Sequence, residues 1–343
     1  MVALWDTTGG EVVQRLAEER RSAGGVTSGL ALTLIVVTDE RRVTEAEAAA
    51  TIAAQQHPTR LLIVVRRNVL DQQSRLDAEI VVGGRLGPCE AVVMRMQGRL
   101  ALHAESVALP LLAPDVPVVT WWHCGPPERI AYDPLGVVAD RRITDSANTD
   151  DPVATLWRRG EDYAPGDTDL AWTRITPLRT LVAGAFDTAT SAPRTARVVA
   201  PHNDPGALLL AGWLKARLGI EPERVDQGRR VSAVALELAD GSELAVTRDN
   251  GTARIRRSEY PERILPMLDR ALGEELAEEL GRLDPDQTYA AALAAATGIP
   301  DPGSRPPRRV HIWHDPALAE CPDGDAHPVG PVNQDGTDFE EIR

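Results

Sequence analysis

Apolar runs separated by amphipathic stretches fill the first half of the chain, and their order predicts alternating strands and helices. Mostly apolar runs lie at 29–38, 61–65, 78–82, 89–97 and 116–124. Such runs are typical of strands that helices cover on both faces. The alanine-rich stretch 44–56 and the stretch 103–112 have helical patterns between them. The pattern therefore predicts a layered α/β domain with a mixed sheet.

Local end signals predict where two helices begin. Thr8 is followed three residues later by Glu11, and Thr44 is followed at the same spacing by Glu47. In a capping box, the hydroxyl and the carboxylate at this spacing each bond a backbone N–H of the first turn. We therefore expect one helix to begin after Thr8 and another after Thr44, with the second ending at His57-Pro58.

The second half of the chain predicts another α/β unit, which contains an antiparallel meander. Helices are expected at 172–186 and 206–218, with a strand at 196–200 between them. Three short strands are expected at 231–239, 243–248 and 252–257, joined by Asp240-Gly241 and Asn250-Gly251. These dipeptides are the strongest short hairpin signals. Two further helices are expected at the acidic stretch 262–282 and the alanine-rich stretch 285–297.

The expected elements divide the chain into two domains and a tail. We place an N-terminal α/β domain at residues 1–150 and a C-terminal α/β domain at 151–298. From 299 to 343 the composition shifts to Pro, Gly, Asp and Arg, with little apolar periodicity. Such a segment buries too little apolar surface to offset its conformational entropy, so we expect a disordered tail.

The strand at 116–124 contains two adjacent tryptophans, Trp121 and Trp122. Neighbouring side chains of a strand point to opposite faces, so the two rings cannot enter the same core layer. One interpretation places one ring in each of two core layers. The other makes one ring an anchor for a partner protein, because Trp is enriched among interface hot spots.

Composition and charge argue against several classes of function. The 343 residues carry a net charge of −14, which argues against nucleic acid as a partner, since binding phosphates needs clustered Lys and Arg. No apolar run reaches the ~18 residues of a membrane span, so no membrane partner is expected. Three separated cysteines and no recognisable signal peptide favour a cytoplasmic protein with reduced thiols. The sequence does not indicate the oligomeric state.

Signatures of catalysis and of cofactor binding are missing from the sequence. A dinucleotide fingerprint needs G-x-G-x-x-G between a strand and a helix, whereas Gly83, Gly84 and Gly87 lie between two expected strands. A hairpin or bulge is the better interpretation of these glycines. The histidines and the cysteine of the tail, between 311 and 327, lack the paired spacing of a zinc site. We therefore expect no catalytic residue, no cofactor and no metal.

Two polar stretches are candidate recognition surfaces. The first contains His57 and Arg60, between a helix end and a strand start, and the second contains Asp167, Asp169, Trp172 and Arg174. One interpretation is helix capping with a surface ion pair, which contributes less than about 1 kcal/mol. The other is a protein interface, where an aromatic anchor with a polar rim is typical.

Arg60, Arg66 and Arg67 support an alternative hypothesis of function. Arginine binds phosphate through bidentate hydrogen bonds, and these three residues flank one expected strand. A sugar-phosphate-binding enzyme or sensor that uses them at the sheet edge is therefore an alternative. Their other interpretation is solvated charge at the strand ends.

Four stretches, in order along the chain, resemble a known family. They are 4–8 (Leu-Trp-Asp-Thr-Thr), 57–60 (His-Pro-Thr-Arg), 117–122 (Pro-Val-Val-Thr-Trp-Trp) and 166–174 (Gly-Asp-Thr-Asp-Leu-Ala-Trp-Thr-Arg). Together they resemble the glucose-6-phosphate dehydrogenase assembly protein (OpcA) family, in its actinobacterial branch. The tail is outside the resemblance.

The resemblance implies a protein without catalysis of its own that binds and activates glucose-6-phosphate dehydrogenase. It would favour the active oligomer of that enzyme and so support the oxidative pentose phosphate pathway. The resemblance also marks candidate partner contacts, which are His57, Arg60, Trp121, Trp122, Asp167, Asp169, Trp172 and Arg174. The cysteine redox control of the cyanobacterial branch does not carry over, because the cysteines here are scattered and no CxxC occurs.

Overall fold

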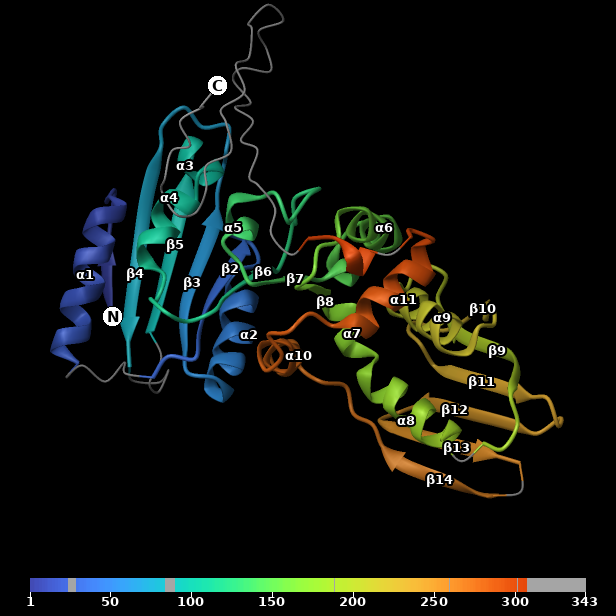
Figure 1. The fold of residues 1–343 in the computed structure, drawn as a ribbon. Coiled ribbons are helices and arrows are strands. Elements are labelled where there is room, and N and C mark those ends of the chain that lie inside the picture. The colour runs from blue at the N-terminus through green and yellow to red at the C-terminus, as the bar shows by residue number, and fades with distance from the viewer. Residues whose placement is uncertain (24–28, 84–89, 188, 259, 301, 307–343) are drawn as a thin grey trace, which may run out of the picture.

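Two β-sheets, each with its own helices, lie side by side in the computed structural model (Figure 1). The structure describes residues 1–23, 29–83, 90–187, 189–258, 260–300 and 302–306. In this part of the chain, the first sheet has eight strands and the second has six. The predicted class, α/β with two mixed sheets and an antiparallel meander in the second, is confirmed. Of the predicted tail, residues 307–343 lie outside the described part of the chain.

The first sheet is mixed, with a large parallel part. It contains β1 (Val2–Leu4), β2 (Leu32–Thr38), β3 (Thr59–Arg66), β4 (Arg75–Val82), β5 (Glu90–Gln97), β6 (Val118–Trp122), β7 (Arg141–Thr144) and β8 (Asp167–Asp169). Its spatial order is β1-β4-β5-β3-β2-β6-β7-β8. The six strands β5, β3, β2, β6, β7 and β8 run parallel, β4 pairs antiparallel with β5, and β1 pairs antiparallel with β4. Numbered along the chain, the parallel strands have the order 3-2-1-4-5-6, which is the order of a dinucleotide-binding sheet.

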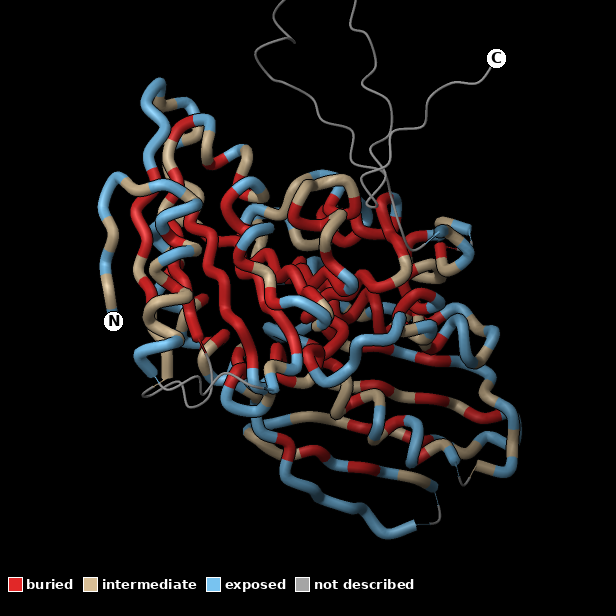
Figure 2. The backbone as a smooth tube through the Cα atoms, turned by 60° about the vertical axis from the view of Figure 1, so that its left-hand side comes forward, coloured by how far each residue is buried: buried red, intermediate tan, exposed pale blue. Residues whose placement is uncertain are grey.

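Helices cover both faces of the first sheet, and each face receives one ring of the tryptophan pair. Trp122 packs with α1 (Gly9–Ser22), α3 (Arg99–Leu102) and α4 (Glu105–Ala108). Trp121 packs on the opposite face with α2 (Val43–Gln56) and α10 (Leu272–Leu280). Both rings are fully buried, as are most residues of the central strands (Figure 2). The interpretation with one ring in each core layer is confirmed, and the partner-anchor interpretation of this pair is wrong.

The second sheet contains the predicted meander, extended on both sides. β11 (Ala233–Leu238), β12 (Glu243–Asp249) and β13 (Thr252–Arg257) pair antiparallel. Asn250 and Gly251 have positive φ angles of 44° and 77°, as a two-residue hairpin turn of this kind requires. β9 (Pro193–Ala200) and β10 (Glu223–Asp226) extend one side of the meander, and β14 (Tyr260–Pro266) extends the other.

Helices pack against one face of the second sheet and form its core. α8 (Thr176–Phe186) and α9 (Pro205–Leu218) contact the sheet, and α11 (Gln287–Thr297) packs on α9. The carboxylate of Asp204 caps α9 as predicted, since it accepts from the N–H groups of Gly206 and Ala207. α5 (Pro134–Val137) joins β6 to β7 within the first body. The 3-10 turn η3 (Ser146–Asn148), α6 (Pro152–Asp162) and α7 (Leu170–Arg174) contact α9 and lie at the junction of the two bodies.

The predicted acidic helix at 262–282 is wrong. The first part of this stretch belongs to β14, and its last part is α10. Pro266 cannot donate to a helical hydrogen bond, so a continuous helix through it is disfavoured. α10 then leaves the second sheet and packs on α2 of the first, where a Cβ at Gly273 would lie 2.6 Å from Ile52 Cβ.

The two predicted capping boxes have different outcomes. At α1 the box is present, because Thr8 Oγ1 accepts from the N–H of Glu11 at 3.3 Å and Glu11 accepts from the N–H of Thr8 at 2.9 Å. At α2 the prediction is wrong, since the helix begins at Val43 and the N-cap residue, Arg42, makes no side-chain cap. The carboxylate of Asp39 instead satisfies the N–H groups in front of this helix.

The two bodies of the structure are not separated by a single boundary in the sequence. The predicted boundary at residue 150 falls within the first sheet, since β8 begins at Asp167 and pairs with β7. The chain also returns to the first body with α10, after the second sheet is complete. Within the described residues, no helix is long and apolar enough to cross a membrane.

Candidate functional site

The carboxyl ends of β2 and β6 mark the point where the strand order of the first sheet reverses. Ligands of open parallel sheets bind in the crevice at such a point. A dinucleotide-binding fold places a glycine-rich turn here, in front of a helix N-terminus, to hold the pyrophosphate. In this chain the turn between β2 and α2 reads Asp39-Glu40-Arg41-Arg42 and contains no glycine.

The carboxylate of Asp39 occupies the position in this turn that an anionic ligand would take. Its Oδ1 accepts from the N–H groups of Arg41 at 2.8 Å and Arg42 at 3.0 Å, and its Oδ2 accepts from Cys124 Sγ at 3.4 Å. Burial alone would raise the pKa of Asp39, but the hydrogen bonds from Cys124 and these N–H groups lower it overall. A phosphate in this turn would meet a negative charge, so the residues present do not fit a dinucleotide.

His123 and Cys124, at the end of β6, do not form an activated nucleophile. Burial raises the pKa of the Cys124 thiol, whereas a nucleophilic cysteine needs a lowered pKa. Burial also lowers the pKa of His123, although its Nε2 lies 3.3 Å from a carboxylate oxygen of Glu45. Both groups are therefore held in their neutral forms and serve packing at the sheet edge.

The stretch 166–174 forms β8 and α7 at the junction of the two bodies. Asp167 is ion-paired with Arg142 of β7, and Asp169 accepts from the hydroxyl of Ser146 at 2.6 Å. Both carboxylates are buried, and burial raises the pKa of each. The prediction that these two aspartates lie on a contact surface is therefore wrong, because both carboxylates are buried and bond to groups of the same chain.

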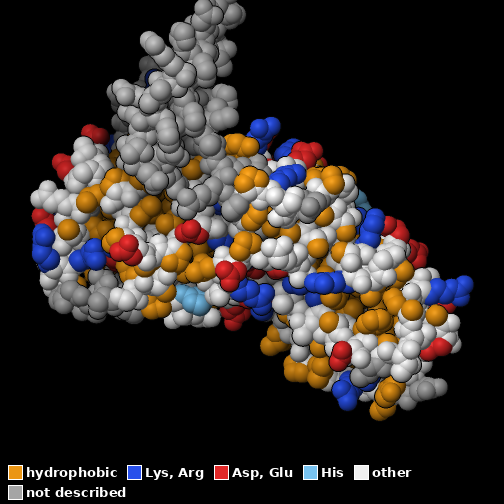
Figure 3. Space-filling model, in the orientation of Figure 1, with side chains coloured by type: hydrophobic (Ala, Val, Ile, Leu, Met, Phe, Trp, Pro, Cys, Tyr) orange, Lys and Arg blue, Asp and Glu red, His pale blue; other side chains and the backbone are white. Residues whose placement is uncertain are grey.

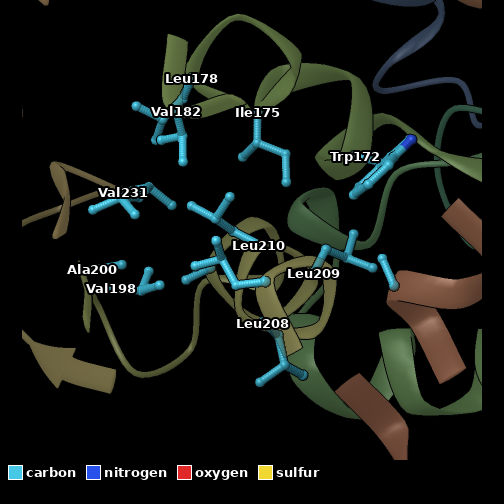
Figure 4. Packing of buried hydrophobic residues seen from close by; sticks show 14 of the residues in the cluster. Trp172, Ile175, Leu178, Val182, Val198, Ala200, Leu208, Leu209, Leu210 and Val231 are labelled. Carbon is cyan, nitrogen blue, oxygen red and sulfur yellow. The ribbon is translucent and has the colours of Figure 1, made fainter. Parts of the chain in front are cut away.

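Trp172 belongs to the core of the second body (Figure 4). Its side chain is 1% exposed, its ring centroid lies 5.9 Å from that of Tyr289, and the guanidinium of Arg179 lies 3.3 Å from the ring centroid. The indole N–H donates to Asp286 at 2.9 Å. The prediction of Trp172 as an exposed anchor is wrong, because every part of the ring already has a partner inside the fold.

Arg174 ties three elements together at the same junction. Its guanidinium donates to both carboxylate oxygens of Asp145 at 2.6 Å, and its Nε lies 2.9 Å from Glu275 of α10. Burial raises the pKa of Glu275 to about 7, although Arg174 opposes that shift. The Arg174 side chain remains 32% exposed, so its role as a partner contact stays a prediction.

A pocket of about 300 Å³ opens beside Arg174. Four arginines line it, namely Arg174, Arg230, Arg248 and Arg270. Arg230 and Arg248 both pair with Asp269, and Arg270 pairs with Glu278. Each of these arginines is paired with a carboxylate of the same chain, and Arg230 and Arg248 share Asp269.

Glu279 of α10 is a structural residue that the sequence reasoning missed. It is buried, forms an ion pair with Arg141 of β7, and accepts from the hydroxyl of Thr173 at 2.6 Å. One signal was present in the sequence, since Glu275 and Glu279 lie four residues apart beside Leu276 and Leu280. Carboxylates next to the apolar stripe of a helix need buried cationic partners.

The three arginines of the alternative hypothesis do not form one site. Arg60 is the second residue of β3, whereas Arg66 ends the strand and Arg67 follows it, so about 20 Å of strand separates Arg60 from Arg66. Arg60 is buried and lies 2.6 Å from Glu90. Arg66 and Arg67 pair with carboxylates elsewhere. The predicted phosphate site is therefore wrong, and so is Arg60 as an accessible partner contact.

His57 lies where the first body meets α10. Its Nε2 is 3.1 Å from the carbonyl oxygen of Ala277, and its side chain is half-buried. This contact joins residues 220 positions apart in the chain, so His57 helps to hold α10 against α2. Its role in partner binding stays a prediction.

Large apolar side chains are exposed beside β1 and along β14, among other places on the described surface. Trp5 is 67% exposed at the end of β1, where backbone N–H groups of Asp6 and Thr7 donate to Asp77 and Leu76 of β4. The second place is the edge strand β14, where Tyr260, Ile264 and Leu265 are exposed, together with Leu268, which follows the strand. Figure 3 shows hydrophobic side chains along this lower edge of the molecule.

The fold and the site define a class of protein. It is a two-sheet α/β protein with the strand order of a dinucleotide-binding domain, in which the chain's own carboxylate fills the cofactor turn. Residues 50–161 match the family model of the glucose-6-phosphate dehydrogenase subunit N-terminal domain, and residues 165–293 match that of its C-terminal domain. The chain belongs to the glucose-6-phosphate dehydrogenase assembly protein (OpcA) family.

Comparison with characterised proteins adds no argument about this chain. No curated protein matches the chain. Among solved structures, KijD10, a 3-ketoreductase from Actinomadura kijaniata in complex with NADP and TDP-benzene, is 12% identical. The match covers 79% of this chain and 96% of that one, with a TM-score of 0.43. A likeness at this level carries no argument about activity.

Proposed function

We propose that the protein is a non-catalytic assembly factor that binds glucose-6-phosphate dehydrogenase and favours its active oligomer. The observation that carries this proposal is the ordered match of both dehydrogenase-subunit domains over residues 50–161 and 165–293. The cofactor turn filled by Asp39 supports it, because that turn does not fit the nicotinamide cofactor that a dehydrogenase of this strand order would need. The protein would act in the cytoplasm, in support of the oxidative pentose phosphate pathway.

Activation follows from a difference in affinity. A binding protein shifts its partner's equilibrium only if it binds the active form more tightly than the inactive form. A tenfold rise in the ratio of active to inactive enzyme needs a difference of about 1.4 kcal/mol per site. One well-packed aromatic anchor at an interface contributes about this much or more.

Trp5 is the best candidate for that anchor. Among the tryptophans of the four stretches that resemble the family, Trp5 is exposed, whereas Trp121, Trp122 and Trp172 are buried. The backbone around Trp5 is fixed by its pairing with β4, so little conformational entropy is lost when the ring is covered. A rigid, exposed ring of this kind is typical of interface hot spots.

Titration of purified dehydrogenase with the protein tests this proposal. Wild-type protein should raise dehydrogenase activity in a saturable way, and Trp5→Ala should raise the half-saturating concentration by about 30-fold, as loss of a hot spot does. Trp157→Ala is the matched control, because Trp157 is also exposed but lies outside the four stretches. Equal behaviour of the two variants would remove Trp5 as the anchor, and absence of any activation by wild type would refute the function itself.

A further inference from the structure

The second sheet has one face that the helices do not use. Its buried face is formed by alternate residues such as Val198, Val234 and Val246, which pack with α8 and α9. On the opposite face, two rows of residues cross the sheet in register. One row is Val225, Val199, Ala233, Thr247, Arg254 and Ile264, and the other is Glu223, Arg197, Ala235, Ala245 and Arg256. All of these residues are half-buried or exposed.

The centre of this open face is unusual for a surface in contact with water. Ala233, Ala235 and Ala245 lie on adjacent central strands, beside Val199 and Thr247. Alanine is depleted in strands, and a solvated face usually carries longer polar or β-branched side chains. A flat floor of small side chains instead permits the close approach of another surface.

Charged residues of both signs border the small floor on both sides. Arg197 lies 3.0 Å from Glu223 on one side, and Arg256 lies 3.0 Å from Glu262 on the other. Arg254 is 3.8 Å from the same Glu262. An apolar centre with a polar rim is the usual arrangement of a protein interface. Because the rim carries both arginines and glutamates, the face can pair opposite charges with a copy of itself.

We propose that two copies of this chain pack these open faces together, about a two-fold axis parallel to β12. Such an axis places β9 of one copy over β14 of the other, because each lies two strands from β12. Arg197 then faces Glu262 of the second copy, and Val199 faces its Ile264. The long side chains of Arg254 and Arg256 lie over the alanines of β11. Ile264 of β14, which is 54% exposed in the single chain, is then covered in the dimer.

The size of the face suits a stable dimer. With the axis at β12, five strands of each copy overlap, namely β9 and β11 to β14. Spaced about 4.8 Å apart and about 20 Å long, they give a face of roughly 500 Å² in projection. The accessible area of a surface with side chains is larger than its projection, so the face approaches the ~800 Å² per partner of a standard interface. Two sheets packed in this way lie about 10 Å apart, with their strands nearly aligned.

Sedimentation of the full chain, without the dehydrogenase, tests the proposal. Wild type should sediment as a dimer at micromolar concentration, and Ala245→Arg should raise the dimer dissociation constant more than tenfold, because it places two like charges at the axis. Ala183→Arg is the matched control, since Ala183 is exposed on α8, which packs on the other face of this sheet. It should remain dimeric. A monomeric wild type, or a dimer unchanged by Ala245→Arg, would overturn the proposal.

Exchanging the charges of a facing pair separates loss of the dimer contact from misfolding of a variant. Arg197→Glu should weaken the dimer, because it faces Glu262 of the second copy, and the double variant Arg197→Glu with Glu262→Arg should restore it. Failure of the double variant to recover, with far-UV circular dichroism and Tm like those of wild type, would contradict the assigned pairing of strands. If wild type is monomeric and Ala245→Arg abolishes dehydrogenase binding, the face belongs to the dehydrogenase and not to a second copy.

Discussion

Buried charges and buried aromatic rings meet at the junction of the two bodies. Glu279 is enclosed by Arg141 and Thr173, which come from β7 and α7. Trp172 lies one residue before Thr173 and faces the core of the second body. Removing one partner of a buried ion pair leaves an uncompensated charge, which is more costly than losing an exposed pair. Single substitutions at this junction should therefore act on stability before they act on binding.

Trp172→Ala should lower the free energy of unfolding by about 3–5 kcal/mol. The ring fills a position in a packed core, so truncation loses apolar burial and leaves a cavity. It also removes the partner of the Arg179 guanidinium and of Asp286. Urea unfolding measures the change, with Trp157→Ala as the exposed control, expected to be within about 1 kcal/mol of wild type. A loss below 1 kcal/mol for Trp172→Ala would contradict its place in the core.

Glu275→Gln should remove one component of the pH dependence of stability. The folded pKa of about 7 lies above the usual value of 4.5, so the folded state binds this proton more tightly than the unfolded state does. The resulting stabilisation is fully present below pH 4.5 and is lost as the pH rises toward 7. Arg174, Asp145 and Arg270 act on the same carboxyl.

Unfolding of wild type and of Glu275→Gln at pH 5, 6 and 7.5 measures this component. The stability of wild type relative to the variant should fall steadily over that range. Glu275→Asp keeps the charge and controls for loss of the ion pair with Arg174. Parallel pH profiles for wild type and Glu275→Gln would contradict the raised pKa.

The chemical character of single residues could be predicted from the sequence, but their partners could not. The sequence marks the polar stretch at 166–174 as unusual but predicts it on the surface, whereas the structure buries most of it. The reason is that Asp167 and Arg142 are 25 residues apart, and Arg174 and Glu275 are about 100 apart. A pattern in one stretch shows that charges need partners and does not show whether water or another element supplies them.

At the scale of elements, the sequence predicts turns and helix caps correctly, because neighbouring residues determine them. The Asp-Gly and Asn-Gly turns, the capping box at Thr8 and the Asp204 cap are set by neighbouring residues and are confirmed. β7 and β8 were missed, because they are four and three residues long and carry arginines and aspartates in place of an apolar run. Their strand conformation comes from pairing in the sheet.

Gly273→Ala should destabilise the packing of α10 on α2 by about 1–3 kcal/mol. A Cβ there would lie 2.6 Å from Ile52 Cβ and 2.8 Å from the carbonyl oxygen of Ala49, which is backbone and cannot rotate away. Gly184→Ala in α8 is the matched control, because its Cβ meets nothing within 4 Å. That variant should be unchanged or up to about 1 kcal/mol more stable. Thermal unfolding compares the two, and equal effects would contradict the close helix contact.

At the scale of the whole molecule, the strand order is that of a dinucleotide-binding domain, but the residues of the turn between β2 and α2 do not fit a dinucleotide. The parallel strands have the arrangement of a dinucleotide-binding domain, while the turn that would hold the cofactor contains Asp39 and Glu40. The second sheet adds a broad open face with a floor of alanines. A scaffold with these properties is suited to contact other proteins, which agrees with its place in the dehydrogenase assembly family.

Sedimentation velocity of glucose-6-phosphate dehydrogenase, with its activity assayed in the same samples, tests the central claim most directly. As the protein is added, the enzyme should shift to a larger species that contains both chains, and its specific activity should rise in parallel and saturate. Unchanged sedimentation and unchanged activity at saturating amounts of protein would contradict the account.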